Sequence, residues 1–538
     1  MQTTSSGFSS VVNSSYRQIG HGVRLSWLKN LVTGINYFTI GTSLIEGNDI
    51  IGNGGSSGVS FFDKYAYTDY GSYVKNWSVD RQIGQYPFGL IMAQADVELD
   101  NSSNLFTPNY DPTIGSGILP GRPLKISTNM GPQDSFQQFT GYTGQPEQNI
   151  VGRSMLLHAY DVVDYLNNYR FSTYSGITFS GMLTNYTTAS AISYYLGKIG
   201  FNANQYSLDN SLLDPIPFIN VTDRKFGDVL DDLMTAEQGL FFADETGITK
   251  FWNKQHFLTT SGTTAFNFSY NNTINIEYAN APIINDVIVT AMPRAVQASQ
   301  SVYSSTTPTA VAAGQTVDIF ASFSDTYGSL PVTTVTTPTY SATAITNSYY
   351  STNANSDGSG AALNSFITIT ATYLFGTAYK ITFANSGSQT VYITALTLYG
   401  TPAKVTSTIN AQYTDQSSVD AYGRNPANNG DVLAISNDFV QSQAAALAIA
   451  FGIVSQYKAA NRHYKVEVFS NPALQIGDYG TLTLPDINQT KTVWITGKTD
   501  KLSTDGNLTQ QLLLEERTLY TYFKIGTSVI AGTDVLAP

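Results

Sequence analysis

Two stretches of the chain carry the same succession of features: Pro-Gly-Arg-Pro-Leu-Lys-Ile at residues 120–126 and Ile-Gly-Asp-Tyr-Gly-Thr-Leu at residues 476–482. Each leads to a second glycine in a strand-like setting, Gly141 in Phe-Thr-Gly-Tyr-Thr and Gly497 in Ile-Thr-Gly-Lys-Thr. The offset between the two copies is 356 residues throughout. The matched positions are glycines and apolar residues of strand character. Self-similarity at a constant spacing predicts a duplicated β-domain.

Duplication bears on function because of symmetry. A protomer with two similar domains, assembled as a trimer, presents six similar units around one axis. With 538 residues the chain is too long for one core, so three or four domains are expected. The repeat therefore favours assembly over catalysis.

The composition is polar but nearly uncharged. Only 12% of the residues are charged, about half the usual share, whereas tyrosine alone reaches 35 residues. Cysteine is absent, which excludes disulfide frameworks, thiolate nucleophiles and zinc ribbons. The net charge of −12 disfavours tight binding to a phosphate backbone. It is compatible with a conduit along which DNA slides, and equally with an acidity that serves solubility alone.

Neither a signal peptide nor a membrane span is expected. Residues 1–8 lack the basic and apolar regions of a cleaved signal. The longest apolar run, residues 444–454, is far too short to cross a bilayer.

The fold class predicted is mainly β with α+β insertions: two similar barrel-like β-domains, a small α+β domain and an inserted β-sandwich. Short aromatic and β-branched runs broken by Gly, Pro and Asn support the β assignments. The predicted division of the chain is a flexible N-terminal arm (1–20), the first β-domain (21–161), an α+β domain (162–265), a discontinuous second β-domain (266–300 and 401–525), an inserted sandwich (301–400) and a C-terminal tail (526–538).

Helical signals appear in the middle of the chain. Thr187 or Thr188 can cap a helix that runs to Gly197, and Thr222 can cap a second helix that stops at Gly239. Residues 244–247, Asp-Glu-Thr-Gly, predict a hairpin turn after that helix.

The insert is set apart by its composition, since residues 301–400 hold four ionisable acid or base side chains: Asp318, Asp325, Asp357 and Lys380. Beyond it a long helix is predicted from about Asp438 to Ala460, with Asn437 as its cap. Its apolar stripe predicts core packing rather than a ligand groove.

No catalytic, cofactor or metal site is predicted. His21, His158, His256 and His463 are scattered without metal-ligand spacing. Neighbouring acids occur at 231–232, 244–245 and 515–516, where helix-surface, turn and strand-end positions explain them better than a pair of carboxylates across a cleft. The chain is therefore expected not to be an enzyme and to need no cofactor.

Sugar binding is the alternative use of the aromatic residues. Tyr349, Tyr350, Tyr373 and Tyr399 of the insert could stack on sugar rings. Tyrosine also favours strands and half-buried interfaces, and all four tryptophans lie outside the insert, so a structural role is the preferred interpretation.

Several segments together resemble the tail hub, or tail-associated baseplate, proteins of tailed bacteriophages and related contractile injection systems. Residues 95–101, 106–108 and 120–126 look like the first tube domain of phage minor tail proteins. Residues 226–252 are similar to the domain inserted in such hubs. Residues 418–424, the alanine-rich helix that follows them, and residues 475–478 and 494–497 resemble the second tube domain.

The resemblance implies a structural virion protein at the tail tip: a homotrimer whose duplicated domains continue the sixfold tail tube and surround the DNA path. Its implied partners are the distal tail protein, the tail tube, and tip or fibre proteins, with passive DNA contact. The nearly uncharged insert departs from the family pattern. The alternative is therefore a host-surface adhesin or glycan-binding tail protein that uses residues 301–400.

Overall fold

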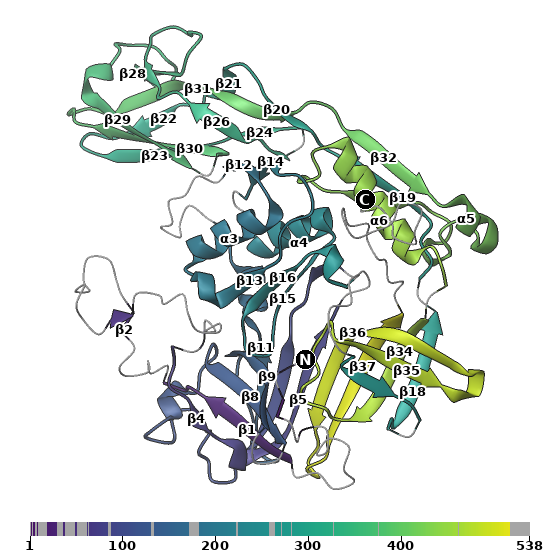
Figure 1. The fold of residues 1–538 in the computed structure, drawn as a ribbon. Helices are drawn as coiled ribbons and strands as arrows, with labels where there is room; N and C mark the ends of the chain where they lie inside the picture. Colours follow the sequence, from purple (N-terminus) through teal and green to yellow (C-terminus); the bar gives the residue numbers. More distant parts are fainter. Residues whose placement is uncertain are drawn as a thin grey trace.

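A computed structural model of the chain is mainly β, as predicted, and stands in three tiers (Figure 1). Two β-rich halves form the base, an α+β layer lies above them, and a β-sandwich lies at the far end. The structure describes residues 2, 4, 5, 8, 19–28, 36–37, 49–50, 62, 64–83, 88–130, 134–171, 182–221, 224–257, 264–270, 272–280, 282–326, 328–374, 376–460 and 462–516.

The first half of the base is built from alternating strands. In β7 (Gln94–Asp100), every second side chain from Ala95 on is buried, as expected of a sheet with one face on a core. That core contains Trp77, Leu124 and Phe139. The strands are β1 (Ile19–Leu25), β4 (Thr68–Asp69), β5 (Val74–Gln82), β7, β8 (Pro123–Met130), β9 (Asp134–Thr143), β10 (Glu147–Asn149) and β11 (Ser154–Tyr160).

The second half repeats this construction around a core of its own, which includes Val466, Leu482, Ile495 and Leu512. Its strands are β17 (Phe266–Phe268), β18 (Asn275–Asn280), β34 (Arg462–Phe469), β35 (Tyr479–Leu484), β36 (Gln489–Leu502) and β37 (Leu508–Glu516).

The two halves share a strand order and are joined in a single sheet. The first half runs β5-β7-β11-β9-β8, and the second runs β18-β34-β37-β36-β35. Antiparallel pairing of β36 with β5, from Gly497 opposite Gln82 to Leu502 opposite Trp77, makes them one 14-stranded sheet.

The spacing of 356 residues holds for the first repeated strand and then shifts. Leu124 and Ile126 of β8 and Leu482 of β35, 356 residues after Ile126, all face a core. Leu124 is opposite Gly141, however, whereas Gly480 is opposite Val493, four residues short of Gly497. The glycines that match in the sequence therefore occupy different ladder positions. The first hairpin is longer, because the β8–β9 ladder continues four residues past Ile126 to Met130, whereas the β35–β36 ladder ends two residues past Leu482.

The α+β layer contains α2 (Val162–Asn168), α3 (Thr188–Ile199) and α4 (Phe226–Glu237). Thr187 caps α3, as predicted, by accepting from the Ser190 backbone N–H. The N-cap of α4 is Lys225, without a side-chain cap, and Thr222 lies outside the described residues. Its strands are β6 (Gly89–Leu90), β12 (Met182–Tyr186), β13 (Tyr206–Leu208), β14 (Ile216–Asn220), β15 (Leu240–Ala243) and β16 (Thr249–Trp252).

One predicted domain boundary was wrong. β19 (Asp286–Ala291), β32 (Ile409–Thr414) and β33 (Leu433–Ser436) were assigned to the second β-domain, but they form a separate three-stranded sheet. Together with α6 (Gln443–Tyr457) they share one hydrophobic core with α3 and α4. Periodicity predicts that a face is buried without saying which element covers it, and here the cover is the α+β layer.

The long helix is also shorter than predicted. α6 begins at Gln443, where Ser442 accepts from the Ala445 N–H. Asn437, the predicted cap, is therefore not the N-cap of α6. Its side chain accepts from the Phe439 N–H and donates to the Asp232 carbonyl of α4. The short helix α5 (Gln416–Tyr422) precedes α6 in the chain.

The insert is a β-sandwich with its own core of Phe323, Ile381, Phe383 and Leu398, among others. One layer gathers on the long strand β31 (Val391–Val405), and the other is β23 (Thr316–Ser322), β30 (Ala378–Asn385) and β29 (Ile367–Leu374). The remaining strands are β20 (Arg294–Val296), β21 (Gln300–Ser305), β22 (Thr309–Val311), β24 (Ser324–Asp325), β25 (Gly328–Ser329), β26 (Val332–Val335), β27 (Thr339–Tyr340) and β28 (Tyr349–Asn353).

The described part of the N-terminal arm, which is predicted to be flexible, packs on its own chain. Phe8 is buried against Phe136, and Ser5 donates to Asp134 from its backbone and its hydroxyl. The predicted C-terminal tail, 526–538, lies outside the described residues. Within the described residues, no helix has the length and apolarity needed to span a bilayer.

Candidate functional site: the junction of the two β-halves

The β36–β5 junction is where the two halves and the α+β layer meet. Trp494 and Ile476 of the second half pack with Leu240 and Phe242 of β15 and with Ile91 of the first half. A hairpin turn from Asp244 to Gly247 follows β15, as predicted, and Asp244 Oδ1 accepts from the Thr246 and Ile248 N–H groups. This turn points the next side chain, Glu245, into the junction.

Glu245 is the centre of a buried ionic cluster. Its Oε1 lies 2.8 Å from Arg81 Nη1 of β5, and its Oε2 accepts from Gln475 Nε2 at 2.6 Å. Lys498 of β36 lies 3.1 Å from Asp500 and donates to the Leu474 carbonyl. The charged side chains are 2–3% exposed. A chain with so few charges thus places two cations and two anions in the seam between its halves.

The charges within the cluster compensate one another. Burial alone would raise the pKa of the Glu245 carboxyl, but the charges of Arg81 and Lys498 and the Gln475 hydrogen bond outweigh burial and hold that pKa below its ordinary value. Removing one member would leave a charge in the interior without compensation, which is strongly destabilising. The arrangement is suited to fixing the angle between the halves.

The other acid pairs also serve structure. Asp232 is ion-paired with Arg224, while burial raises its pKa and Arg224 opposes that rise. Asp244 stabilises the hairpin turn and is paired with Lys250 at 3.1 Å. Glu516 accepts from the Tyr464 hydroxyl within the second half. Contacts within the fold therefore explain these carboxylates.

The histidines lie in separate places. His158 Nδ1 is 2.6 Å from Asp96, and His256 stacks on Trp252 with ring centroids 3.9 Å apart. His463 lies 3.8 Å from Glu515, and His21 is in β1. Among the described residues no group of three or more metal-ligating side chains comes together.

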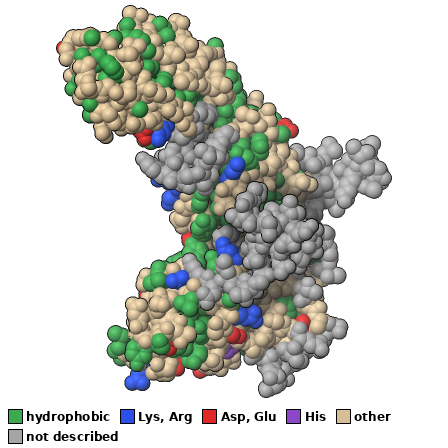
Figure 2. Space-filling view, turned by 90° about the vertical axis from the view of Figure 1, so that its left-hand side faces the viewer, with side chains coloured by type: hydrophobic (Ala, Val, Ile, Leu, Met, Phe, Trp, Pro, Cys, Tyr) green, Lys and Arg blue, Asp and Glu red, His purple; other side chains and the backbone are tan. Residues whose placement is uncertain are grey.

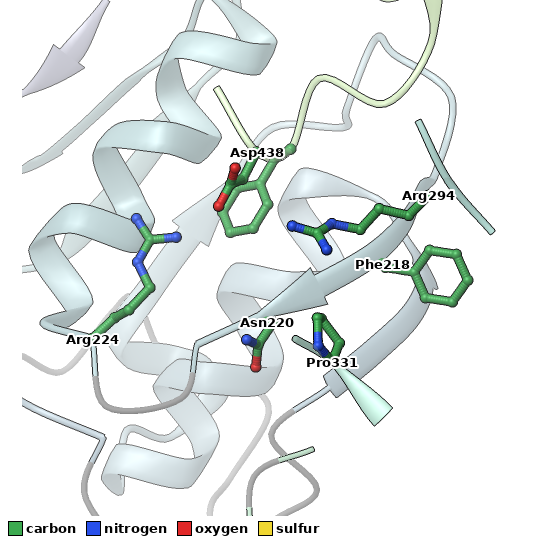
Figure 3. A pocket seen from close by; sticks show the side chains of 7 residues that line it. Phe218, Asn220, Arg224, Arg294, Pro331 and Asp438 are labelled. Atoms are coloured by element: carbon green, nitrogen blue, oxygen red, sulfur yellow. The ribbon is translucent and has the colours of Figure 1, made fainter. Parts of the chain in front are cut away.

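A small pocket of about 100 Å³ lies where the sandwich meets the α+β layer. Figure 3 shows the guanidinium groups of Arg224 and Arg294 on either side of Asp438, with Asn220 and Pro331 below. Arg224 is already paired with Asp232, and its guanidinium carbon lies 5.7 Å from the centre of the Phe439 ring. The pocket is electrically balanced and lacks a nucleophile beside a base.

The tyrosines considered for sugar stacking are not brought together on one open face. Tyr350 is 6% exposed and packs against Phe383 in the sandwich core, so it cannot stack on a ligand. Tyr349 and Tyr399 are half-buried, and the side chain of Tyr373 lies outside the described residues. Among the side chains of the insert that the structure describes, the exposed rings are instead Phe320 and Phe366, which the sequence did not single out.

Comparison with known proteins yields structural neighbours alone. No family model matches the chain, and no curated protein matches its sequence. The 43 kDa tail protein of prophage MuSo2 from Shewanella oneidensis aligns over 84% of this chain and 94% of its own, at 10% identity and a TM-score of 0.43. A tail protein from Neisseria meningitidis covers 92% of this chain and 97% of its own, at 9% identity and a TM-score of 0.44.

An Escherichia coli component of the type VI secretion system aligns over 83% of this chain and 74% of its own, at 8% identity and a TM-score of 0.35. These values describe a similar outline rather than superposable detail. These three structures are two tail proteins and a component of the type VI secretion system.

Proposed function

We propose that this chain is a structural protein of a phage tail, a trimeric hub at the distal end that continues a sixfold tube and surrounds the DNA path. The observation that carries the proposal is the repeated strand order, β5-β7-β11-β9-β8 and β18-β34-β37-β36-β35, within one sheet. Two equivalent β-halves in each protomer let three copies offer six similar units to a sixfold partner.

The charge balance suits such a channel. The chain has a formal net charge of −12 and is poor in charges of either sign. A neutral or acidic wall does not retain a polyanion, so DNA would pass without being held by phosphate contacts.

A non-enzymatic role is part of the proposal. Asp244 and Glu245 are engaged in the hairpin turn and the ionic cluster, Asp232 in an ion pair with Arg224, and Glu516 with the Tyr464 hydroxyl. Contacts within the fold thus account for at least one carboxylate of each pair that the sequence singled out.

Imaging of labelled particles tests the proposal. A gold or antibody label on this chain should appear at the distal end of the tail, on the tail axis. A label on the side of the tail, or on fibres away from the axis, would contradict a hub.

A second candidate function, binding of a host-surface glycan by the insert, is favoured by one observation. The sandwich has its own core, and the face seen in Figure 2 shows few charged side chains at its end of the molecule. Phe320 and Phe366 are 46% and 39% exposed on this domain. Proteins commonly bind sugars by stacking exposed aromatic rings on them.

Excision of the insert separates the two functions. Val296 and Ala403 are paired across β20 and β31, so replacing residues 297–402 by Asn-Gly would close a two-residue hairpin. Assembly should persist, because the insert has a separate core, whereas cell or glycan binding should be lost. Unchanged binding by the excised variant would remove the glycan hypothesis.

A further inference from the structure

The junction inside the chain is a template for a contact between chains. At the β36–β5 junction Thr499 is opposite Asp80, Lys501 is opposite Ser78 and Leu502 is opposite Trp77. Leu502 is 3% exposed there, because it and Leu508, which flank the turn between β36 and β37, belong to the core of the first half. The second half thus reaches into the first with the tip of one hairpin.

The equivalents of β5 can be followed through the ladders. Leu157 of β11 and Leu512 of β37 both face their cores. Their partners on the next strand are Val97 and Val466, and the partners of those are Trp77 of β5 and Ile276 of β18. Trp77 and Ile276 are therefore equivalent, and so are Asp80 and Ala279.

β9 and β10 pair with successive parts of β11, so the two together correspond to β36, and β10 corresponds to its C-terminal part. The same ladder equivalence aligns Met155 of β11 with Gln510 of β37, and their partners are Gln148 of β10 and Asp500 of β36. Glu147 thus corresponds to Thr499 and Ile150 to Leu502. The next pair along each ladder agrees, since Asn149 opposite Ser154 corresponds to Lys501 opposite Thr509.

The two counterparts are not joined to each other within the chain. Among the described strands β10 pairs with β11 alone, and β18 pairs with β34 alone, so each presents an open edge. All three residues of β10 are exposed. An open edge is a template for pairing with another strand.

Apolar side chains cluster at both edges. Ile150 and Val151, on the turn after β10, are 79% and 96% exposed. Around β18, Ile274, Tyr278 and Phe469 are 46%, 55% and 60% exposed. Ile150 is thus largely exposed to solvent, whereas its counterpart Leu502 is buried. Large apolar groups gathered at an open strand edge indicate a protein interface.

We infer that copies of this chain join edge to edge, β10 of one copy adding antiparallel to β18 of the next. The register is that of the internal junction: Glu147 opposite Ala279, Asn149 opposite Glu277, and Ile150 beside Ile276 of the neighbour. Each copy offers one β10 and one β18, so the contact is head to tail and closes into a ring. This inference rests on the proposed function, which supplies three copies per ring.

Disulfide trapping reads the register directly, since the chain has no cysteine of its own. The double variant Glu147→Cys/Ala279→Cys places two thiols opposite each other on antiparallel strands, where Cα atoms lie about 4.5–5.5 Å apart, within disulfide range. Oxidation of the assembled protein should give covalent trimers on a denaturing gel. Thr499→Cys/Asp80→Cys is the matched control and should form a disulfide within one chain.

A native mass measurement accompanies the trapping. A trimer that yields no cross-link at 147 and 279, while the 499 and 80 control closes, would overturn the inference and leave the trimeric hub standing. A monomer at all concentrations would overturn both.

Substitution of the turn gives an independent readout. Ile150→Asp should weaken assembly by at least about tenfold, because burial of an isoleucine is worth about 1.5–3 kcal/mol. Ile345→Asp, at an isoleucine of the insert that is 39% exposed, should leave assembly unchanged. Equal assembly of the two variants would count against β10 as the contact.

Discussion

Substitution of Glu245 by alanine is predicted to destabilise the junction of the two halves strongly. Glu245 and Arg81 are 2% and 3% exposed and 2.8 Å apart, so the variant leaves a guanidinium in the interior without its carboxylate. The loss of one partner of a buried pair costs about 3–5 kcal/mol. This cost comes from the unpaired guanidinium and not from the attraction within the pair. The double variant Arg81→Met/Glu245→Met removes both charges and should therefore lie close to the native stability.

Urea unfolding followed by tryptophan fluorescence measures this cost. Trp77 and Trp494 are 1% and 2% exposed on the two sides of the junction, so they report its opening. A matched surface pair supplies the control: Lys380 and Asp318 are also 2.8 Å apart but about one-third exposed, and Asp318→Asn should cost about 1 kcal/mol or less. The reasoning is refuted if Glu245→Ala unfolds within 1 kcal/mol of the native chain, or if the double variant is less stable than the single one.

Three further outcomes are expected. Burial raises the pKa of Asp161 to about 7, against backbone N–H donors and Arg81, so its contribution to stability is full below about pH 4 and is lost as the pH rises through 7. In Asp161→Asn the urea midpoint should change less with pH over that range. An unchanged dependence of the midpoint on pH would contradict the assignment. Gly141→Ala should cost about 2 kcal/mol or more, because its Cβ would lie 2.1 Å from the Tyr160 carbonyl oxygen. Gly197→Ala, in a helix with nothing within 4 Å of the new Cβ, should raise stability by about 1 kcal/mol, and thermal unfolding should show these opposite signs.

The local elements could be predicted from the sequence where local chemistry decides them. Thr187 caps α3 because its side chain reaches an N–H three residues on, and the turn after Asp244 forms because that carboxylate accepts from the backbone. Short aromatic and β-branched runs broken by Gly, Pro and Asn predicted the strands. The duplication was visible because the matched residues are strand glycines and core positions.

The tertiary partners could not be predicted in the same way. Glu245 occupies a turn position that normally faces solvent, and nothing near it in the sequence reveals that Arg81 and Lys498 meet it there. The four-residue shift between the halves depends on how far each hairpin extends, since β8 runs to Met130 and β35 ends at Leu484, and the hydrophobic pattern does not encode these lengths. The apolar face of α6 was visible, but its partners in the α+β layer are set by packing at long range.

The central claim is that three copies of this chain form a ring of six similar β-halves around a channel. Averaged end-on images of the purified assembly in the electron microscope test it most directly. The account predicts a threefold particle, three times 58.3 kDa, with an inner ring of six alternating units around an open or plugged axis. A monomer, or a twofold particle without an axial ring, would contradict it.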